Sequence, residues 1–127
     1  MRLNPDCIRD ILLETETGSF RIMSSLRHKE TPFSDYEFLN KYSFDEVSYH
    51  LNQCELMNFV KLSKALGYTD VIDLNPEGHF FLADIRDSNI WNKTKSTASE
   101  LGLSSLNALK DISVNVVSAL ITNYFVK

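Results

Sequence analysis

The sequence predicts an α+β fold, a winged helix-turn-helix with a C-terminal helical extension. The first observation behind this prediction is a run of apolar residues at helical spacing over 43–57, which opens on a capping motif. The second is the change of period that follows, where two short apolar runs on either side of Gly67 are typical of a β-hairpin, the wing. We expect the winged-helix domain to span residues 1–86 and the extension to span residues 87–127.

The N-terminal segment predicts one helix and one short strand. Asn4 suits the N-cap and Pro5 the first helical position, while Asp6 places a negative charge at the positive end of the helix dipole. The expected apolar face consists of Cys7, Ile8, Ile11 and Leu12. Gly18 should end this helix. Residues 20–23 alternate in polarity, so we expect a short strand that pairs with the wing.

Two capping boxes predict the helix-turn-helix itself. In a capping box, a Ser side chain and a Glu side chain three residues later each satisfy a backbone N–H at the start of a helix. Ser34 and Glu37 form the first such pair, and Ser43 and Glu46 form the second. Residues 24–33 are typical of a loop. We therefore expect a short helix from Ser34, a turn, and a recognition helix that begins after Ser43.

The last part of the chain predicts three further helices. Asn75, Pro76 and Glu77 repeat the N-terminal start signal, and residues 87–89 can either interrupt the helix or cap a new one. Residues 93–100 are polar, so we expect this part of the helix to be solvated. The final helix follows and reaches the C-terminal end of the sequence.

The final helix carries a wide apolar stripe, wider than the two positions per heptad of a coiled-coil seam. Two interpretations remain open. The stripe can fold back over the winged-helix domain, or it can pair with its copy in a second chain. We expect a homodimer whose interface is formed by Leu109, Ile112, Val116, Leu120 and Tyr124.

The recognition helix and the wing supply the candidate nucleic-acid contacts. These are Ser48, Tyr49, Asn52 and Gln53 on the helix, for base edges, and Lys61 and Lys64 on the wing, for backbone phosphates. Asn and Gln suit adenine because their amides can make two hydrogen bonds to it. The same side chains are also consistent with the ordinary polar face of a structural helix. Lysines on a wing can equally serve to prevent aggregation of an edge strand.

The distribution of charge argues against tight DNA binding. The net charge is −4, and residues 42–86 carry three basic and seven acidic side chains. Phosphate contacts by Lys and Arg supply most of the nonspecific affinity of a protein for DNA. Since the segment expected to face DNA is strongly acidic, the charge favours a protein partner over DNA.

We expect no enzymatic activity, no cofactor and no metal site. The three histidines and two cysteines have no pair at metal-ligand spacing, and the sequence contains none of the common phosphate-binding or nucleophile motifs. His50, on the recognition helix, is expected to pack or to form a hydrogen bond. No apolar stretch is long enough to span a bilayer, and the first residues lack the apolar core of a signal peptide. We therefore expect a cytoplasmic protein with no membrane partner.

Several short motifs together resemble a known family. They are LNPDCIRDILL at 3–13, YSFDEV at 42–47, YHL at 49–51 with Gln53, Leu74 with PEGH at 76–79 and FL at 81–82, IRD at 85–87, and Trp91 with Lys93, Thr94 and Lys95. The ordered set is similar to small proteins of unknown function that phages, prophages and other mobile elements of bacteria carry. The resemblance implies a winged-helix-like fold and a mobile-element setting, and it implies no established activity.

Two functions are expected from the fold and the resemblance together. The first is a phage-type winged-helix protein that binds DNA and regulates transcription. The alternative is a non-enzymatic inhibitor that binds a protein of a host defence system, for example through an acidic surface that mimics DNA. The expected partner is therefore either DNA or a host protein.

Overall fold

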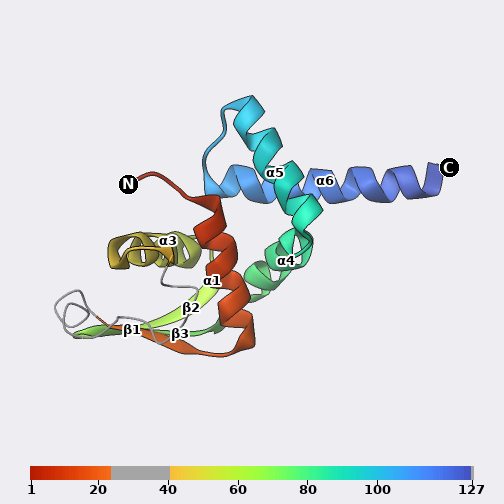
Figure 1. Cartoon of the computed structure of the whole chain (residues 1–127). Coiled ribbons are helices and arrows are strands. Elements are labelled where there is room, and N and C mark those ends of the chain that lie inside the picture. The colour runs from red at the N-terminus through yellow and green to blue at the C-terminus, as the bar shows by residue number, and fades with distance from the viewer. Residues whose placement is uncertain (24–40, 127) are drawn as a thin grey trace.

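The computed structural model describes residues 1–23 and 41–126, and within these residues it has five helices and a three-stranded antiparallel sheet (Figure 1). In chain order the elements are α1 (Pro5–Thr17), β1 (Phe20–Met23), α3 (Phe44–Leu56), β2 (Val60–Ala65), β3 (Tyr68–Leu74), α4 (Pro76–Ile85), α5 (Ser88–Leu101) and α6 (Leu106–Val126). The predicted α+β class is confirmed. The loop expected at 24–33 and the short helix expected from Ser34 lie outside the described residues.

The sheet joins the strand after α1 to the hairpin after α3. The strand order is β1-β3-β2, so β3 lies in the centre and pairs antiparallel with both neighbours. Phe20 lies opposite Val71 in the register, and both side chains are buried. Leu66 and Gly67 connect β2 to β3, and Gly67 has a φ of +90°, which favours glycine. The expected pairing of the first strand with the hairpin is confirmed.

Helices α1 and α3 begin at their predicted caps. Asn4 Oδ1 accepts a hydrogen bond from the backbone N–H of Asp6, and Pro5 is the first helical residue. Ser43 and Glu46 form the expected capping box, in which each side chain accepts a backbone N–H of the other residue, at 3.1 and 3.3 Å. These contacts fix where the two helices start, and their apolar faces then pack against each other and against the sheet.

The hairpin and α4 meet where the backbone of Phe59 approaches Gly78. The carbonyl oxygen of Phe59 accepts the N–H of Asn75 at 2.9 Å, and a Cβ at Gly78 would lie 2.1 Å from the same oxygen. A side chain is thus excluded at Gly78. Asn75 is the N-cap residue of α4, as predicted, but its side chain makes no capping bond. It donates instead to Oδ1 of Asn58 at 3.0 Å, because the connection before β2 brings that amide within reach.

Helices α4, α5 and α6 extend the same hydrophobic core. Helix α4 packs on α1, and α5 and α6 pack on each other and on α4. Of the two alternatives for residues 87–89, the structure shows the cap, because Asp87 accepts the N–H groups of Asn89 and Ile90 at the start of α5. The segment expected to be solvated is in fact buried at Thr94 and Ala98, because one side of α5 contributes to the core.

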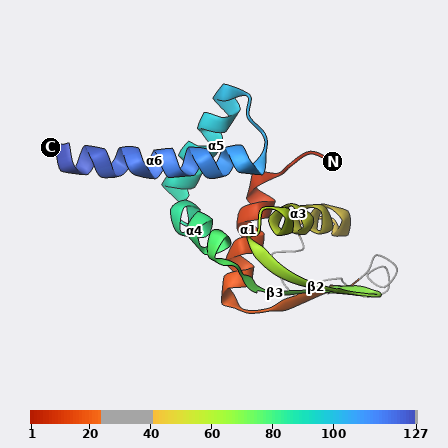
Figure 2. The same ribbon diagram turned by 180° about the vertical axis from the view of Figure 1, so that it is seen from behind.

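Helix α6 is covered along its first half only. Leu106 and Leu109 are buried against the body of the chain, whereas the last turns project beyond α4 and α5, as the two opposite views show (Figures 1 and 2). Helix α3 and the hairpin lie at the other end of the molecule (Figure 1). The fold therefore presents two separate features, the face formed by α3 and the hairpin and the projecting half of α6.

Candidate nucleic-acid interface

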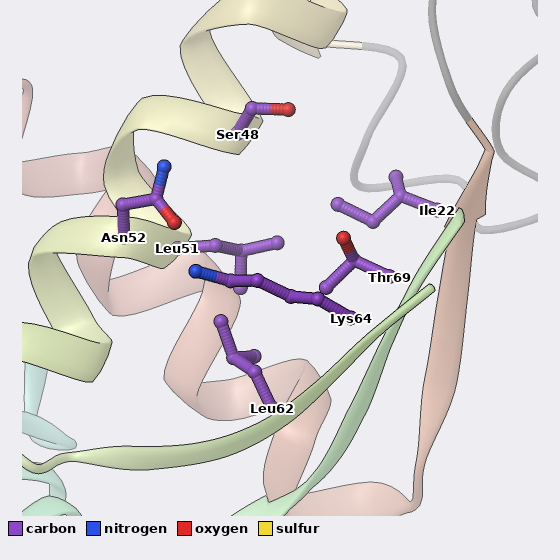
Figure 3. A pocket seen from close by; sticks show the side chains of 7 residues that line it. All are labelled: Ile22, Ser48, Leu51, Asn52, Leu62, Lys64 and Thr69. Carbon is purple, nitrogen blue, oxygen red and sulfur yellow. The ribbon is translucent and has the colours of Figure 1, made fainter. Parts of the chain in front are cut away.

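Helix α3 and the hairpin face each other across a groove (Figure 3). Its lining residues are Ile22, Ser48, Leu51, Asn52, Leu62, Lys64 and Thr69. Three of these side chains are apolar, and polar side chains from both elements lie beside them (Figure 3). The structure thus brings together three of the predicted contact residues, Ser48 and Asn52 from α3 and Lys64 from β2. Thr69 joins them from the central strand, and only the pairing of the strands could have placed it there.

Lys64 is paired with a carboxylate of the helix it faces. Its Nζ donates to Oε1 of Glu55 at 2.9 Å, and its side chain extends from β2 towards α3 (Figure 3). Both side chains are more than one third exposed to solvent. A surface ion pair of this kind contributes little to stability, about 0 to 1 kcal/mol, so a phosphate could displace the carboxylate. The pair nevertheless removes the net positive charge from this position.

Arg21 and Asp70 form a second ion pair on the sheet. Arg21 Nε and Nη2 donate to the two carboxylate oxygens at 2.6 and 3.1 Å, across the β1–β3 register. The guanidinium also lies 3.9 Å from the centre of the Tyr68 ring. These hydrogen bonds from Arg21 hold the pKa of the Asp70 carboxyl below its usual value. The sequence does not predict this ion pair, because the two residues meet only when β1 pairs with β3.

The N-terminus of α3 carries its own acidic groups. Asp45 and Glu46 lie in the first turn, and the Glu46 carboxylate accepts the N–H of Ser43. Carboxylates here interact favourably with the helix dipole, and they occupy the position where a helix N-terminus would otherwise attract a phosphate. The acidic side chains at this end of α3 therefore stabilise the helix and leave no site for an anion.

The other predicted contact residues lie outside the groove lining. Tyr49 and Gln53 are half-buried on α3, and the Tyr49 ring packs edge-on against His50 with centroids 4.9 Å apart. Lys61 is exposed on β2 and lies opposite Asp73 in the strand register. The six residues therefore do not all line one groove. Ser48, Asn52 and Lys64 remain the set that the fold brings together.

His50 is a buried structural residue of α3. Its Nε2 accepts the backbone N–H of Asn4 at 2.7 Å, and its Nδ1 lies 2.6 Å from the carbonyl oxygen of Glu46, to which it donates. Both ring nitrogens are thus used, and the imidazole links α3 to the residue that caps α1. The expectation that His50 packs and forms hydrogen bonds is confirmed.

Neither cysteine offers a reactive or metal-binding group. Cys7 and Cys54 are fully buried and free. Burial raises the pKa of the Cys7 thiol to about 12, and burial likewise raises the pKa of Cys54. Among the residues that the structure describes, no three His, Cys, Asp or Glu side chains are grouped so that they could hold a metal ion.

The residues expected at a dimer interface fall into two groups along α6. Leu109 and Ile112 are buried inside the chain itself, at 1% and 8% exposure, and Val116 is partly buried against the same core. Leu120 and Tyr124 are 51% and 74% exposed. Leu120 and Tyr124 can therefore meet a partner without unfolding the chain. In the ranges 1–23 and 41–126, no helix combines the length and the apolar character needed to cross a membrane.

Comparison with known proteins gives a family but no activity. The chain is 29% identical over 129 residues to an uncharacterized protein of Haemophilus influenzae, an alignment that covers 95% of this chain and 99% of that protein. No solved structure matches. A family of hypothetical proteins, DUF2513, matches residues 2–104, which span the elements from α1 to the end of α5. The chain therefore belongs to the DUF2513 family of hypothetical proteins.

Proposed function

We propose that this chain is a non-enzymatic winged-helix protein of a mobile genetic element, which binds DNA through α3 and the hairpin and regulates transcription. The order of elements supports the winged-helix assignment, since α1 and β1 precede α3 and the β2–β3 hairpin, and β1 closes the sheet on β3. In such a fold the helix before the wing enters the major groove, and the wing contacts the neighbouring backbone.

The observation that carries the proposal is the juxtaposition of Ser48, Asn52 and Lys64 across one groove. A hydroxyl and an amide on exposed turns of a helix can hydrogen-bond base edges, and the amide suits adenine. A lysine opposite them on the wing can contact a phosphate at the same time. Because Lys64 is paired with Glu55, we expect DNA binding to be weak at physiological salt.

The test is a fluorescence anisotropy titration of the full chain with a random-sequence duplex and with DNA upstream of its own gene. Measured from about 50 to about 200 mM salt, affinity for both DNAs should fall steeply. Lys64→Gln should weaken binding and reduce the salt slope by about one. Lys93→Gln, which removes the same charge from an exposed position on α5, should change neither. Absence of binding even at low salt would refute the proposal.

A second candidate function is supported by charge. The segment from 42 to 86 has seven acidic and three basic side chains, and two cations of the sheet, Lys64 and Arg21, are both paired with carboxylates. Such a surface suits a protein that itself binds nucleic acid, as in an inhibitor of a host defence enzyme that mimics DNA. This candidate predicts no DNA binding at any salt concentration, and it predicts competition with DNA for the target protein.

The proposal also includes the state in which the chain acts. We propose a homodimer held by the C-terminal helix in the bacterial cytoplasm. Exposed Leu120 and Tyr124 support the dimer, because large apolar side chains on a projecting helix favour association.

A further inference from the structure

The projecting half of α6 exposes an unusual amount of apolar surface. Six large side chains there are between 48% and 77% exposed, namely Val114, Leu120, Ile121, Tyr124, Phe125 and Val126. Val114, Ile121 and Tyr124 from this set, together with Val117, follow one another at steps of three, four and three residues. This is the spacing of a two-helix seam, in which each apolar side chain inserts between side chains of the facing helix. The surface is therefore shaped for another helix.

The absence of charge in the projecting half of α6 limits which kind of partner can supply that helix. Residues 112–126 contain no charged side chain. A peripheral membrane helix or a nucleic-acid contact would need Lys or Arg on its polar face, and this segment has none. Two copies of a chain with a net charge of −4 repel each other over most of their surface, so they can associate most easily through an uncharged segment.

We propose that the segment from Val114 to Val126 docks against the same segment of a second copy, with the two helices antiparallel. This deepens the dimer of the proposed function, and it assigns the contact to the projecting turns only. The first part of the predicted stripe, Leu109 and Ile112, stays in the core of its own chain. The contact is isologous, so one two-fold axis passes between the helices near their midpoint.

The antiparallel direction follows from where the body of the chain is attached. The body covers the N-terminal half of α6, and the free half extends away from it (Figures 1 and 2). A parallel pair would place two acidic bodies side by side at one end. An antiparallel pair places them at opposite ends, and it also aligns the helix dipoles favourably. The face of α3 and the hairpin, which lies far from the projecting turns, stays free in both copies (Figure 1).

The size of the contact sets the expected strength. The segment is about 20 Å long at 1.5 Å per residue and a helix is about 10 Å wide, so two such helices can bury only a few hundred Å². This is below the about 1,200 Å² at which stable specific interfaces begin, which implies a weak, reversible dimer. Sedimentation equilibrium over a range of micromolar concentrations can therefore follow both species.

The first experiment compares the unmutated full chain with Ile121→Glu and Leu101→Glu. Ile121 is 54% exposed on the proposed seam and Leu101 is 61% exposed on α5, so neither change should unfold the chain, which circular dichroism will verify. We expect Ile121→Glu to raise the dissociation constant at least tenfold and Leu101→Glu to leave it unchanged. A chain that stays monomeric at high micromolar concentration, or equal effects of the two variants, would overturn the proposal.

The second experiment tests the direction of pairing with introduced thiols. The native Cys7 and Cys54 are fully buried, so Val114→Cys and Tyr124→Cys each add one accessible thiol. Mixing the two variants with a short bismaleimide should give a cross-linked heterodimer in excess of either homodimer. Preferential cross-linking of Tyr124→Cys to itself would show a parallel pair and overturn the antiparallel assignment. Both experiments omit DNA, so failure of the dimer and failure of DNA binding are distinguishable.

Discussion

The indole Nε1–H of Trp91 on α5 donates a hydrogen bond of 2.9 Å to Oδ1 of Asp6 in the first turn of α1. Lys95 Nζ, one turn further along α5, donates to the same oxygen at 2.8 Å. The Asp6 carboxylate thus contacts two residues of α5 that lie 85 and 89 positions further along the sequence. It links the C-terminal helices to the start of the chain. The contact thus adds a polar link to the apolar packing that holds α5 and α6 on the rest of the chain.

The Asp6 contact predicts a pH dependence of stability. Partial burial alone would raise the pKa of Asp6, but the hydrogen bonds from Lys95 and Trp91 hold it below its ordinary value of 3.8. The folded pKa is lower than the unfolded one, so the contribution is complete above pH 4 or so and is lost as pH falls through the folded pKa. Since Asp6 is largely exposed, we expect at most about 1 kcal/mol.

The measurement uses Trp91, the single tryptophan of the chain, as the probe. Urea unfolding followed by its fluorescence should show Asp6→Asn to be less stable than the unmutated chain at pH 7, with the difference shrinking as the pH falls below 3.8 and through the folded pKa. Asp111→Asn, at an exposed position on α6, serves as the control and should cost nothing at any of these pH values. A difference for Asp6→Asn that persists unchanged at low pH would contradict the role of the charged carboxylate.

Removal of the Glu55 carboxylate should release Lys64. Glu55→Gln leaves the shape of α3 unchanged and frees the Lys64 ammonium, which then faces the groove without its partner. If α3 and the hairpin bind DNA, the affinity should rise several-fold, because Lys64 no longer has to leave a carboxylate partner in order to contact a phosphate. Glu100→Gln, which removes an equal charge from an exposed position on α5, is the matched control. Weaker binding of Glu55→Gln to DNA would contradict the DNA-binding proposal.

Gly78→Ala should be strongly destabilising. A Cβ there would lie 2.1 Å from the Phe59 carbonyl oxygen, which is itself held by the N–H of Asn75. Relief of this clash requires α4 to move away from the hairpin, and we expect a cost of about 3 kcal/mol or more. Gly102→Ala is the comparison, since nothing lies near its Cβ and only its φ of +70° opposes the change. It should cost about 1 kcal/mol in chemical denaturation. Equal costs for the two variants would contradict the steric argument.

The two thiols should not react while the chain is folded. Full burial of Cys7 and Cys54, together with thiol pKa values raised by that burial, leaves no accessible thiolate at neutral pH. Ellman's reagent at pH 8 should modify neither residue in buffer and both residues in concentrated guanidinium chloride. Rapid modification of the folded chain would show that the contact of α1 with α3 opens locally.

Much of the fold could be predicted because its signals are local. The capping box of Ser43 and Glu46 and the Asn4–Pro5 start place α3 and α1 correctly, since both depend on atoms within three residues of each other. The hairpin around Gly67 follows from alternation and from a turn that needs a positive φ. The same reasoning failed at residues 93–100, where a polar composition hides the burial of Thr94 and Ala98.

The candidate site was predictable only in part. Sequence spacing put Ser48 and Asn52 on one side of a helix, but it could not show that Lys64 would face them or that Glu55 would neutralise it. The sequence also could not show at which residue of α6 the apolar stripe is no longer covered by α4 and α5. The partners of an ion pair can be nine residues apart in the sequence or lie on two paired strands. The distance between their charged atoms then depends on every turn of the chain between them.

The sequence by itself determined where most of the described helices and strands begin and which side of each is apolar. Hydrogen bonds within one turn and the alternation of side chains act over a few residues, so these features survive any arrangement of the rest. Only the tertiary structure decided which polar groups meet and which apolar groups stay exposed. Leu109 and Leu120 are identical residues on one stripe of one helix, yet the first is 1% and the second 51% exposed. The difference arises because α4 and α5 cover only the first half of α6, and their attachment to α1 places them there.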